Sequence, residues 1–256
     1  MAVDRRKSSA IATGAMALLF ALLLASTTAS AEVVQKGGVR VSVTGSLTPT
    51  KLPRSAAAAI AVTVASHITP TTPSALPKLE WIAIAINSHG KLQNRRTPRC
   101  RLGHISPSTT QEALAACRPA LIGEGHFSAN VRIAEQSPFP SEGKILAFNG
   151  KLNGKPAIFA HIYGTDPVPT SYVLPFLIVK GEGAYGTVLE ASLPNVTGEW
   201  GYVTGVSLDL QPRFISASCP APAGFPGAVF PLMRTSFGFN GGLKLTSVLN
   251  RSCKVR

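Results

Sequence analysis

Acidic residues are scarce in this chain, and their scarcity limits the chemistry that the sequence can support. Only 12 of the 256 residues are Asp or Glu, against 25 Lys and Arg, which gives a formal net charge of +13. The acidic residues are dispersed, so the sequence presents no obvious pair of the carboxylates that glycosidases use. The charge balance instead favours anionic surroundings.

Motifs for metals and nucleotides are missing as well. The five histidines form neither HExxH nor HxH, and the four cysteines form no CxxC pair, so the sequence predicts no metal site and no cofactor. Residues 181–186 fit G-x-G-x-x-G, but residues 187–193 after them have the character of a strand. A dinucleotide fingerprint opens a helix. We therefore expect a hairpin turn there and no nucleotide cofactor.

The one long apolar run lies near the N-terminus and is short for a transmembrane helix. It covers residues 10–25, 16 residues, whereas an α-helix needs about 20 to cross a bilayer. Basic residues 5–7 precede it and Ala29-Ser30-Ala31 ends it, which is the layout of a secretory signal peptide. We expect residues 1–31 to be removed, leaving residues 32–256 as a secreted or extracytoplasmic protein without a transmembrane span; an uncleaved membrane anchor is the alternative. The mature charge is then about +11.

The few cysteines that are present indicate disulfides. Cys100, Cys117, Cys219 and Cys253 all follow the signal peptide, and an even number of cysteines in an exported chain predicts bridges. Of three connectivities, the sequence favours Cys100–Cys117 with Cys219–Cys253, because each bridge then joins neighbouring segments. Loops of this size contribute about 3 to 4 kcal/mol each in the chain-entropy model.

Alternation of period two is the dominant pattern in the rest of the chain. In residues 39–44, for example, three valines alternate with Arg40, Ser42 and Thr44, as in a half-buried strand. Turn residues separate such segments, which predicts an all-β fold: a mainly antiparallel β-sandwich of about 11 strands in a single domain, residues 32–256. Residues 32–38 are expected to be a flexible leader. The predicted strands are 39–44, 60–65, 80–87, 127–133, 144–149, 157–163, 172–180, 185–193, 201–210, 228–239 and 243–249.

One short helix is predicted among the strands, at residues 108–117. It begins just after Pro107, and Thr109 stands three residues before Glu112, the spacing of a capping box. A bridge between Cys100 and Cys117 would pin this helix and the loop before it.

His161 is the most usable titratable side chain for catalysis. It shares a strand face with Tyr163, and Asp166 follows at the next turn. A histidine with a phenol and an acid nearby can act in proton transfer, so these residues define an alternative function, an extracellular hydrolase. A hydrogen-bonded structural histidine at a strand end explains the same pattern.

Two surface features offer binding functions. Lys91, Arg95, Arg96, Arg99 and Arg101 form the densest basic cluster, which suits an anionic cell-wall polymer or polysaccharide or is simply solvated surface. The loop between Cys100 and Cys117 is a further candidate for contact with a protein partner.

Aromatic side chains could in addition form a sugar platform. Trp200 and Tyr202 share one strand face, and Trp81 lies on another strand. Aromatic residues also fill cores, and we expect that role for Trp200 and Tyr202.

Several segments resemble a family of secreted bacterial β-rich proteins that has no assigned activity. They include LAFNG at 146–150, AHIYGT at 160–165, WGYVTG at 200–205 and RSCKVR at 251–256. The resemblance implies export and a single shared domain, and it implies no ligand and no catalytic residue. Together with the sequence patterns, it predicts an exported, disulfide-stabilised, non-catalytic binding or structural protein of the cell envelope or extracellular space.

Overall fold

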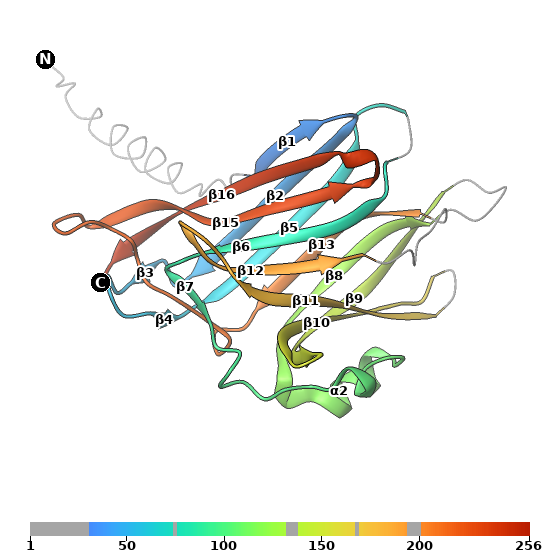
Figure 1. The fold of residues 1–256 in the computed structure, drawn as a ribbon, viewed down its shortest axis with the longest axis horizontal. Helices are drawn as coiled ribbons and strands as arrows, with labels where there is room; N and C mark the ends of the chain where they lie inside the picture. Colours follow the sequence, from blue (N-terminus) through green and yellow to red (C-terminus); the bar gives the residue numbers. More distant parts are fainter. Residues whose placement is uncertain (1–30, 74–75, 132–137, 167–168, 194–200) are drawn as a thin grey trace, which may run out of the picture. The chain divides into compact units, whose positions relative to one another are not determined.

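Thirteen strands form one continuous sheet in the computed structural model of the chain (Figure 1). The structure describes residues 31–73, 76–131, 138–166, 169–193 and 201–256. Apart from Ala31, the predicted signal peptide lies outside the described residues. Residues 31–256 form one compact unit.

The large sheet has the strand order β1-β2-β5-β13-β8-β9-β10-β11-β12-β6-β15-β16-β3, and a small sheet has the order β4-β14-β7. Neighbouring strands pair antiparallel, except that β3 runs parallel to β16. The strands are β1 (Glu32–Lys36), β2 (Val39–Thr48), β3 (Lys51–Leu52), β4 (Ala58–Ala59), β5 (Ala61–Pro70), β6 (Leu79–Asn87), β7 (Gly90–Leu92), β8 (Leu121–Val131), β9 (Phe139–Leu152), β10 (Lys155–Gly164), β11 (Thr170–Lys180), β12 (Tyr185–Ser192), β13 (Gly201–Leu210), β14 (Ile215–Ala217), β15 (Gly227–Phe239) and β16 (Lys244–Val255). The helical elements are η1 (Leu102–His104), α2 (Thr110–Cys117), η2 (Arg118–Ala120) and η3 (Asn240–Gly242).

The all-β, mainly antiparallel fold with one short helix is confirmed. Each of the eleven predicted strands corresponds to a strand of the large sheet, although residues 132–133 of one prediction lie outside the described part. The remaining described strands, β1, β3, β4, β7 and β14, have five residues or fewer and carry little alternation to detect. The expectation of a flexible leader at residues 32–38 is wrong, because β1 pairs with β2 in a hairpin from Glu32↔Val43 to Lys36↔Val39.

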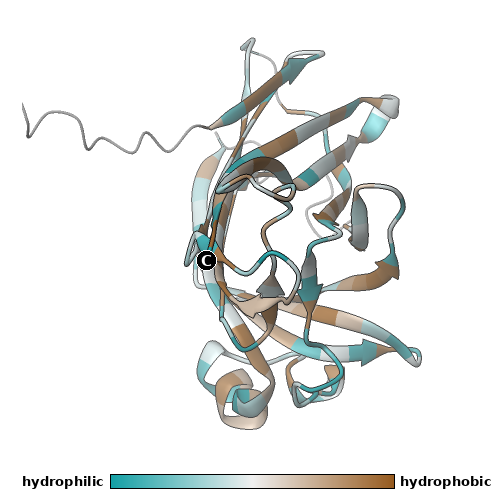
Figure 2. Cartoon of the chain, turned by 90° about the vertical axis from the view of Figure 1, so that its left-hand side faces the viewer, coloured by the Kyte–Doolittle hydropathy of each residue, from teal (hydrophilic) through white to brown (hydrophobic). Residues whose placement is uncertain are grey.

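The facing layers of the fold come from one curled sheet rather than from two separate sheets. Strand β16 stands next to last in the strand order, yet it contacts β1 and β2 at the opposite end. The Arg251 side chain on β16 donates from Nε to the carbonyl oxygen of Gly45 on β2 at 2.6 Å. Figure 2 shows the strands curving around the interior. Right-handed twist accumulates over many strands and bends a large sheet in this way.

The curl gives each strand an inner and an outer face, and both faces of β9 and β10 are covered. Ala147 and Ile158 point inward and pack with Phe214. Phe148 and Phe159 point outward and are fully buried beneath the segment that carries α2. This double burial explains why residues 144–149 have a nearly continuous apolar sequence instead of strict alternation.

Helix α2 begins at the predicted capping box. The Glu112 backbone N–H donates to Thr109 Oγ1 at 3.3 Å, and the Thr109 N–H donates to Glu112 Oε2 at 2.8 Å. These bonds satisfy donors that the first turn of a helix otherwise leaves unpaired. Among the helices that the structure describes, none is long and apolar enough to span a membrane.

Both disulfides have the pairing that the sequence favours. Cys100 is bonded to Cys117 and Cys219 to Cys253, so no cysteine is free within the described residues. The first bridge fixes α2 to the loop before η1, and the second fixes residues 218–226 to β16. Both therefore fasten segments that lie outside the long strands.

Candidate functional site

The basic cluster extends from Lys91 in β7, through the loop that follows this strand, to Arg101 just after Cys100. Lys91, Arg95, Arg96, Arg99 and Arg101 are all exposed. Two further cations lie next to residues that contact Cys100. Arg118 follows Cys117, the disulfide partner, and Lys151 follows Gly150, which forms a parallel bridge with Cys100. We call the exposed cations Lys91, Arg95, Arg96, Arg99, Arg101, Arg118 and Lys151 the basic surface.

Asn149 holds the basic loop against β9. Its side chain is 1 % exposed, and its amide nitrogen lies 3.0 Å from the Asn94 carbonyl oxygen, 2.9 Å from that of Thr97 and 3.0 Å from that of Pro98. The Cys100 backbone N–H donates in turn to the Asn149 carbonyl oxygen at 2.8 Å. The contacts of Asn149 with three carbonyl groups of the loop thus fix the backbone from which the arginines project.

A second anchor lies at the start of the loop. The Gln93 backbone N–H donates to the carbonyl oxygen of Phe214 at 2.7 Å, and its side-chain amide donates to Ser216 Oγ at 2.9 Å. The Gln93 carbonyl oxygen accepts from Thr97 through both N–H and Oγ1. Because both ends of the loop are fixed, the backbone of the basic surface is ordered before any partner binds.

Carboxylates are nearly absent around the basic surface. No Asp or Glu occurs between Glu80 and Glu112 in the sequence. Glu112 is engaged in the capping box, and these hydrogen bonds lower the pKa of its carboxyl group. Among the described residues, no carboxylate forms an ion pair with the arginines of this surface. Their guanidinium groups therefore remain available to an external anion.

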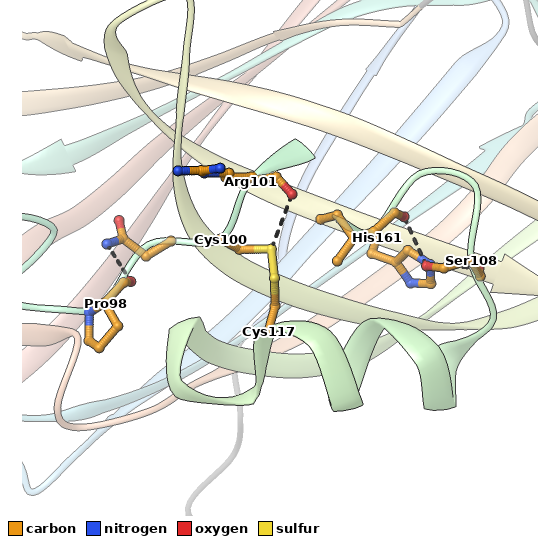
Figure 3. Close-up of a disulfide and its surroundings, with 8 residues drawn as sticks. Pro98, Cys100, Arg101, Ser108, Cys117 and His161 are labelled. Atoms are coloured by element: carbon orange, nitrogen blue, oxygen red, sulfur yellow. Dashed lines mark hydrogen bonds between the residues drawn. A yellow bond between two sulfur atoms is a disulfide. The ribbon is translucent and has the colours of Figure 1, made fainter. Parts of the chain in front are cut away.

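His161 lies on the outer face of β10, beneath the α2 segment, and is fully buried (Figure 3). Its Nε2 lies 3.0 Å from the carbonyl oxygen of Ser108, to which an Nε2–H donates. The hydroxyls of Ser108 and Ser171 lie 3.2 and 3.4 Å from the same nitrogen. His161 thus joins the entry to α2 with β10 and β11.

The other ring nitrogen of His161, Nδ1, differs from Nε2 in its surroundings. Nδ1 is buried without a hydrogen bond among the described residues. Desolvation by burial is the main influence on the ring and lowers the pKa of His161 below its ordinary value of 6.5. The contacts describe a neutral histidine that fixes a loop.

The structure does not bring the three predicted catalytic residues into one hydrogen-bonded group. Asp166 is exposed and its carboxylate accepts from Thr165 Oγ1 at 3.0 Å. Tyr163 is half-buried. The described hydrogen bonds of His161 lead to Ser108 and Ser171 instead, a contact that the spacing in the sequence did not reveal because Ser108 is 53 residues away.

The aromatic candidates are dispersed in the described part of the chain. The Trp81 indole lies against Gly238, where a Cβ would come within 1.9 Å of Nε1, and Lys244 Nζ lies 5.3 Å from the ring centroid. Tyr202 packs against the main core and its hydroxyl accepts from Asn130 Nδ2 at 3.0 Å. Trp200 lies outside the described residues.

The glycine-rich stretch forms the β11–β12 hairpin. The Gly181 N–H donates to the carbonyl oxygen of Gly186 at 3.1 Å, and the Tyr185 N–H donates to that of Glu182 at 3.1 Å. The expected hairpin is confirmed. Within the described ranges, no group of three or more His, Cys, Asp or Glu side chains is placed to hold a metal ion.

The interior of the curled sheet contains two apolar cavities, of about 140 and about 100 Å³. Both are lined by Val64, Ile84, Ala160, Phe176 and Met233, so they adjoin. If the larger cavity were empty, it would cost about 3 kcal/mol of stability, taking 24 cal/mol per Å³. Alternation in the sequence does not reveal this space, because it shows which side chains share a face but not whether they fill the space between facing strands.

Comparisons with known proteins add no relative: no protein-family model, curated protein or solved structure matches the chain.

Proposed function

We propose that this protein works outside the cytoplasm as a disulfide-stabilised, non-catalytic binding protein for an anionic cell-wall polymer or polysaccharide. The observation that carries the proposal is the basic surface, which is exposed, nearly free of carboxylates and built on a backbone fixed by Asn149 and Gln93. A preordered loop loses less entropy on binding than a mobile one. Arginine is suited to this role because its planar guanidinium group binds carboxylate or phosphate through two parallel hydrogen bonds.

Two features support a location outside the cytoplasm. Both cysteine pairs form disulfides, which persist in oxidising compartments. The N-terminal 31 residues have the layout of a signal peptide, and the resemblance to secreted bacterial proteins points to the same destination. N-terminal sequencing of protein recovered from the culture medium or envelope should begin at Glu32. Recovery of the uncleaved chain from the cytoplasm would contradict export.

The polymer proposal can be tested by chromatography on an immobilised uronic acid polymer and on an immobilised teichoic acid. The wild-type protein should be retained at low salt and released as salt rises, since screening weakens contacts between exposed charges. Four arginines of the basic surface are replaced together by glutamine in the test variant, which is R95Q/R96Q/R99Q/R101Q. This variant should elute at clearly lower salt.

A control variant removes the same number of charges elsewhere. It replaces four exposed cations on other elements and is K36Q/R40Q/K51Q/K180Q. We expect it to elute close to the wild type. If both variants lost retention equally, net charge rather than the basic surface would explain binding, and a wild-type protein that stayed in solution at low salt would overturn the proposal.

A hydrolase with a site near His161, Tyr163 and Asp166 is less well supported. The imidazole is buried, Nδ1 lacks an acidic partner among the described residues, and Asp166 is engaged with Thr165. A screen with esterase and glycosidase substrates addresses this alternative. Turnover that disappeared in a folded His161→Ala variant would favour the hydrolase over the binding protein.

A further inference from the structure

The interior of the curled sheet is a second candidate binding site, and it is separate from the basic surface. Along β10, Ala160 and Ile162 line the cavities, whereas Phe159 and His161 face outward beneath the α2 segment. None of the cations of the basic surface lines either cavity, so a ligand inside the sheet would not occupy the basic surface. The inference does not depend on the proposed function.

Side chains around the cavities are incompletely packed. Val64, Ile84 and Phe176 point inward but are only partly buried, whereas Phe148 and Phe159 on the covered outer face are fully buried. Protein interiors are normally close-packed, and large aliphatic side chains in a filled core touch neighbours on all sides. The interior therefore has room for a guest.

The lining chemistry restricts that guest to an apolar body. No charged side chain lines either cavity, and the smaller cavity has no polar side chain in its lining. Water needs two to four polar partners to occupy such a space stably, so the smaller cavity is poorly suited to it. In the larger cavity, Ser66 and Thr235 supply two hydroxyl groups.

The two cavities follow one another along the strands. The larger one is lined by Ile162 of β10 and Val206 of β13, and the smaller one by Ile158 and Leu208 of the same strands. Side chains on one face recur every second residue, a step of about 7 Å along a strand. The combined space is thus elongated parallel to the strands.

Size and shape together select the occupant. Each cavity has a volume close to that of the engineered cavity of about 150 Å³ that admits one benzene ring. Two such spaces placed end to end suit a straight hydrocarbon chain. The hydroxyls of Ser66 and Thr235 suit a neutral polar end in the larger cavity, whereas a carboxylate there would be buried without a cation.

We propose that the curled sheet binds a single-chain neutral lipid, such as a straight-chain alcohol, with its chain along the strands and its hydroxyl near Ser66 and Thr235. The residues shared by both cavities form the middle of the site. Ala160 is the smallest of them, so a larger side chain at this position would divide the space in two.

The test measures binding of decanol and decanoate by calorimetry. Decanol should bind the wild-type protein saturably. Decanoate should bind more weakly by a factor of about ten or more, because its charge has no partner inside the sheet. Ala160→Leu should weaken decanol binding about tenfold or more. The matched control is Ala116→Leu, an exposed position on α2, which should bind like the wild type. Equal binding of decanol by both variants would overturn the proposal.

Methyl spectra of the wild-type protein provide a test that needs no variant in the sheet. Decanol should shift the signals of Ile84 and Ile158, which line the cavities, and leave Ile105, buried outside the sheet beneath α2, unchanged. Absence of shifts at Ile84 and Ile158 would overturn the proposal. So would a response to phosphatidylcholine vesicles without a response to decanol, because the chain would then come from a membrane lipid.

Discussion

Single buried polar side chains fix the segments that carry the outer surface of this protein. Asn149 fixes the basic loop from β9, and His161 fixes the entry to α2 from β10, the two strands of one hairpin. Both residues are almost completely buried. Since a buried polar group that loses its partners costs about 1 to 3 kcal/mol, each is expected to matter more for stability than any exposed charge.

Protonation of His161 should destabilise the fold at acidic pH. Burial lowers its folded-state pKa below 6.5, so as pH falls through about 6.5 the unfolded chain takes up a proton that the folded chain resists. The contribution of neutral His161 to the free energy of unfolding is therefore fully present above about pH 6.5. It decreases as the pH falls below this value, until the folded-state pKa is reached. Urea unfolding at pH 7.5 and pH 5 should show a smaller loss for His161→Gln than for the wild type.

The control for this measurement is His126→Gln, which changes an exposed histidine on β8. It should retain the wild-type dependence on pH. A His161→Gln protein with an unchanged pH dependence would show that other groups determine acid sensitivity.

Loss of the Asn149 amide should release the basic loop. Asn149→Ala removes the donor that lies within 3.0 Å of three loop carbonyl oxygens, and we expect a loss of about 2 to 3 kcal/mol. Limited trypsin digestion should then cut faster after Arg95, Arg96 or Arg99. Asn250→Ala, at an exposed position on β16, is the control and should digest like the wild type.

At the scale of elements, α2 depends on its cap and its disulfide more than on an apolar face. Only Ala113 and Cys117 of its eight residues are buried. An isolated helix of this length is unstable in water. The capping box at its start and the bridge to Cys100 near its end therefore hold it in place over β9 and β10.

Removal of the cap should destabilise the protein modestly. Thr109→Ala leaves the N–H of Glu112 without its acceptor, and a lost cap of this kind costs about 1 kcal/mol. Chemical unfolding should detect the change, whereas Gln111→Ala, at an exposed position in the first turn, should have almost no effect. If both variants were equally stable, the capping box would contribute nothing to the folded state.

At the scale of the whole molecule, the two disulfides constrain loops of different length. Cys100 and Cys117 are separated by 17 residues, and Cys219 and Cys253 by 34. In the chain-entropy model these bridges stabilise by about 3 and about 4 kcal/mol. The second also joins a connection outside the long strands to β16, whose curl brings it against β1 and β2.

Replacing each pair by serines should reproduce this order. The Cys219→Ser/Cys253→Ser protein should unfold at lower denaturant than the Cys100→Ser/Cys117→Ser protein, and both at lower denaturant than the wild type. Thiol titration of the unfolded wild-type chain should find no free cysteine before reduction. Wild-type stability in either double variant would contradict a structural role for that bridge.

Local patterns predicted the elements and the basic cluster, but not the long-range contacts that position side chains such as His161. The capping box at Thr109 and the hairpin at residues 181–186 depend on residues close in sequence, so they could be recognised directly. The contact between His161 and Ser108 joins residues 53 apart and could not. Strand β1 was missed because its polar sequence, EVVQK, pairs with β2 through backbone hydrogen bonds that do not require an apolar face.

The sequence by itself determined the all-β class, the eleven long strands, the capped helix, the favoured disulfide pairing and the acid-free basic stretch, because each follows from residues near one another or from composition. Only the tertiary structure decided that the strands form one curled sheet, that α2 covers the outer face of β9 and β10, and that the inner face encloses an elongated apolar space. Alternation assigns side chains to two faces of a strand. The order and twist of the strands decide which face becomes the inside and how much room it leaves.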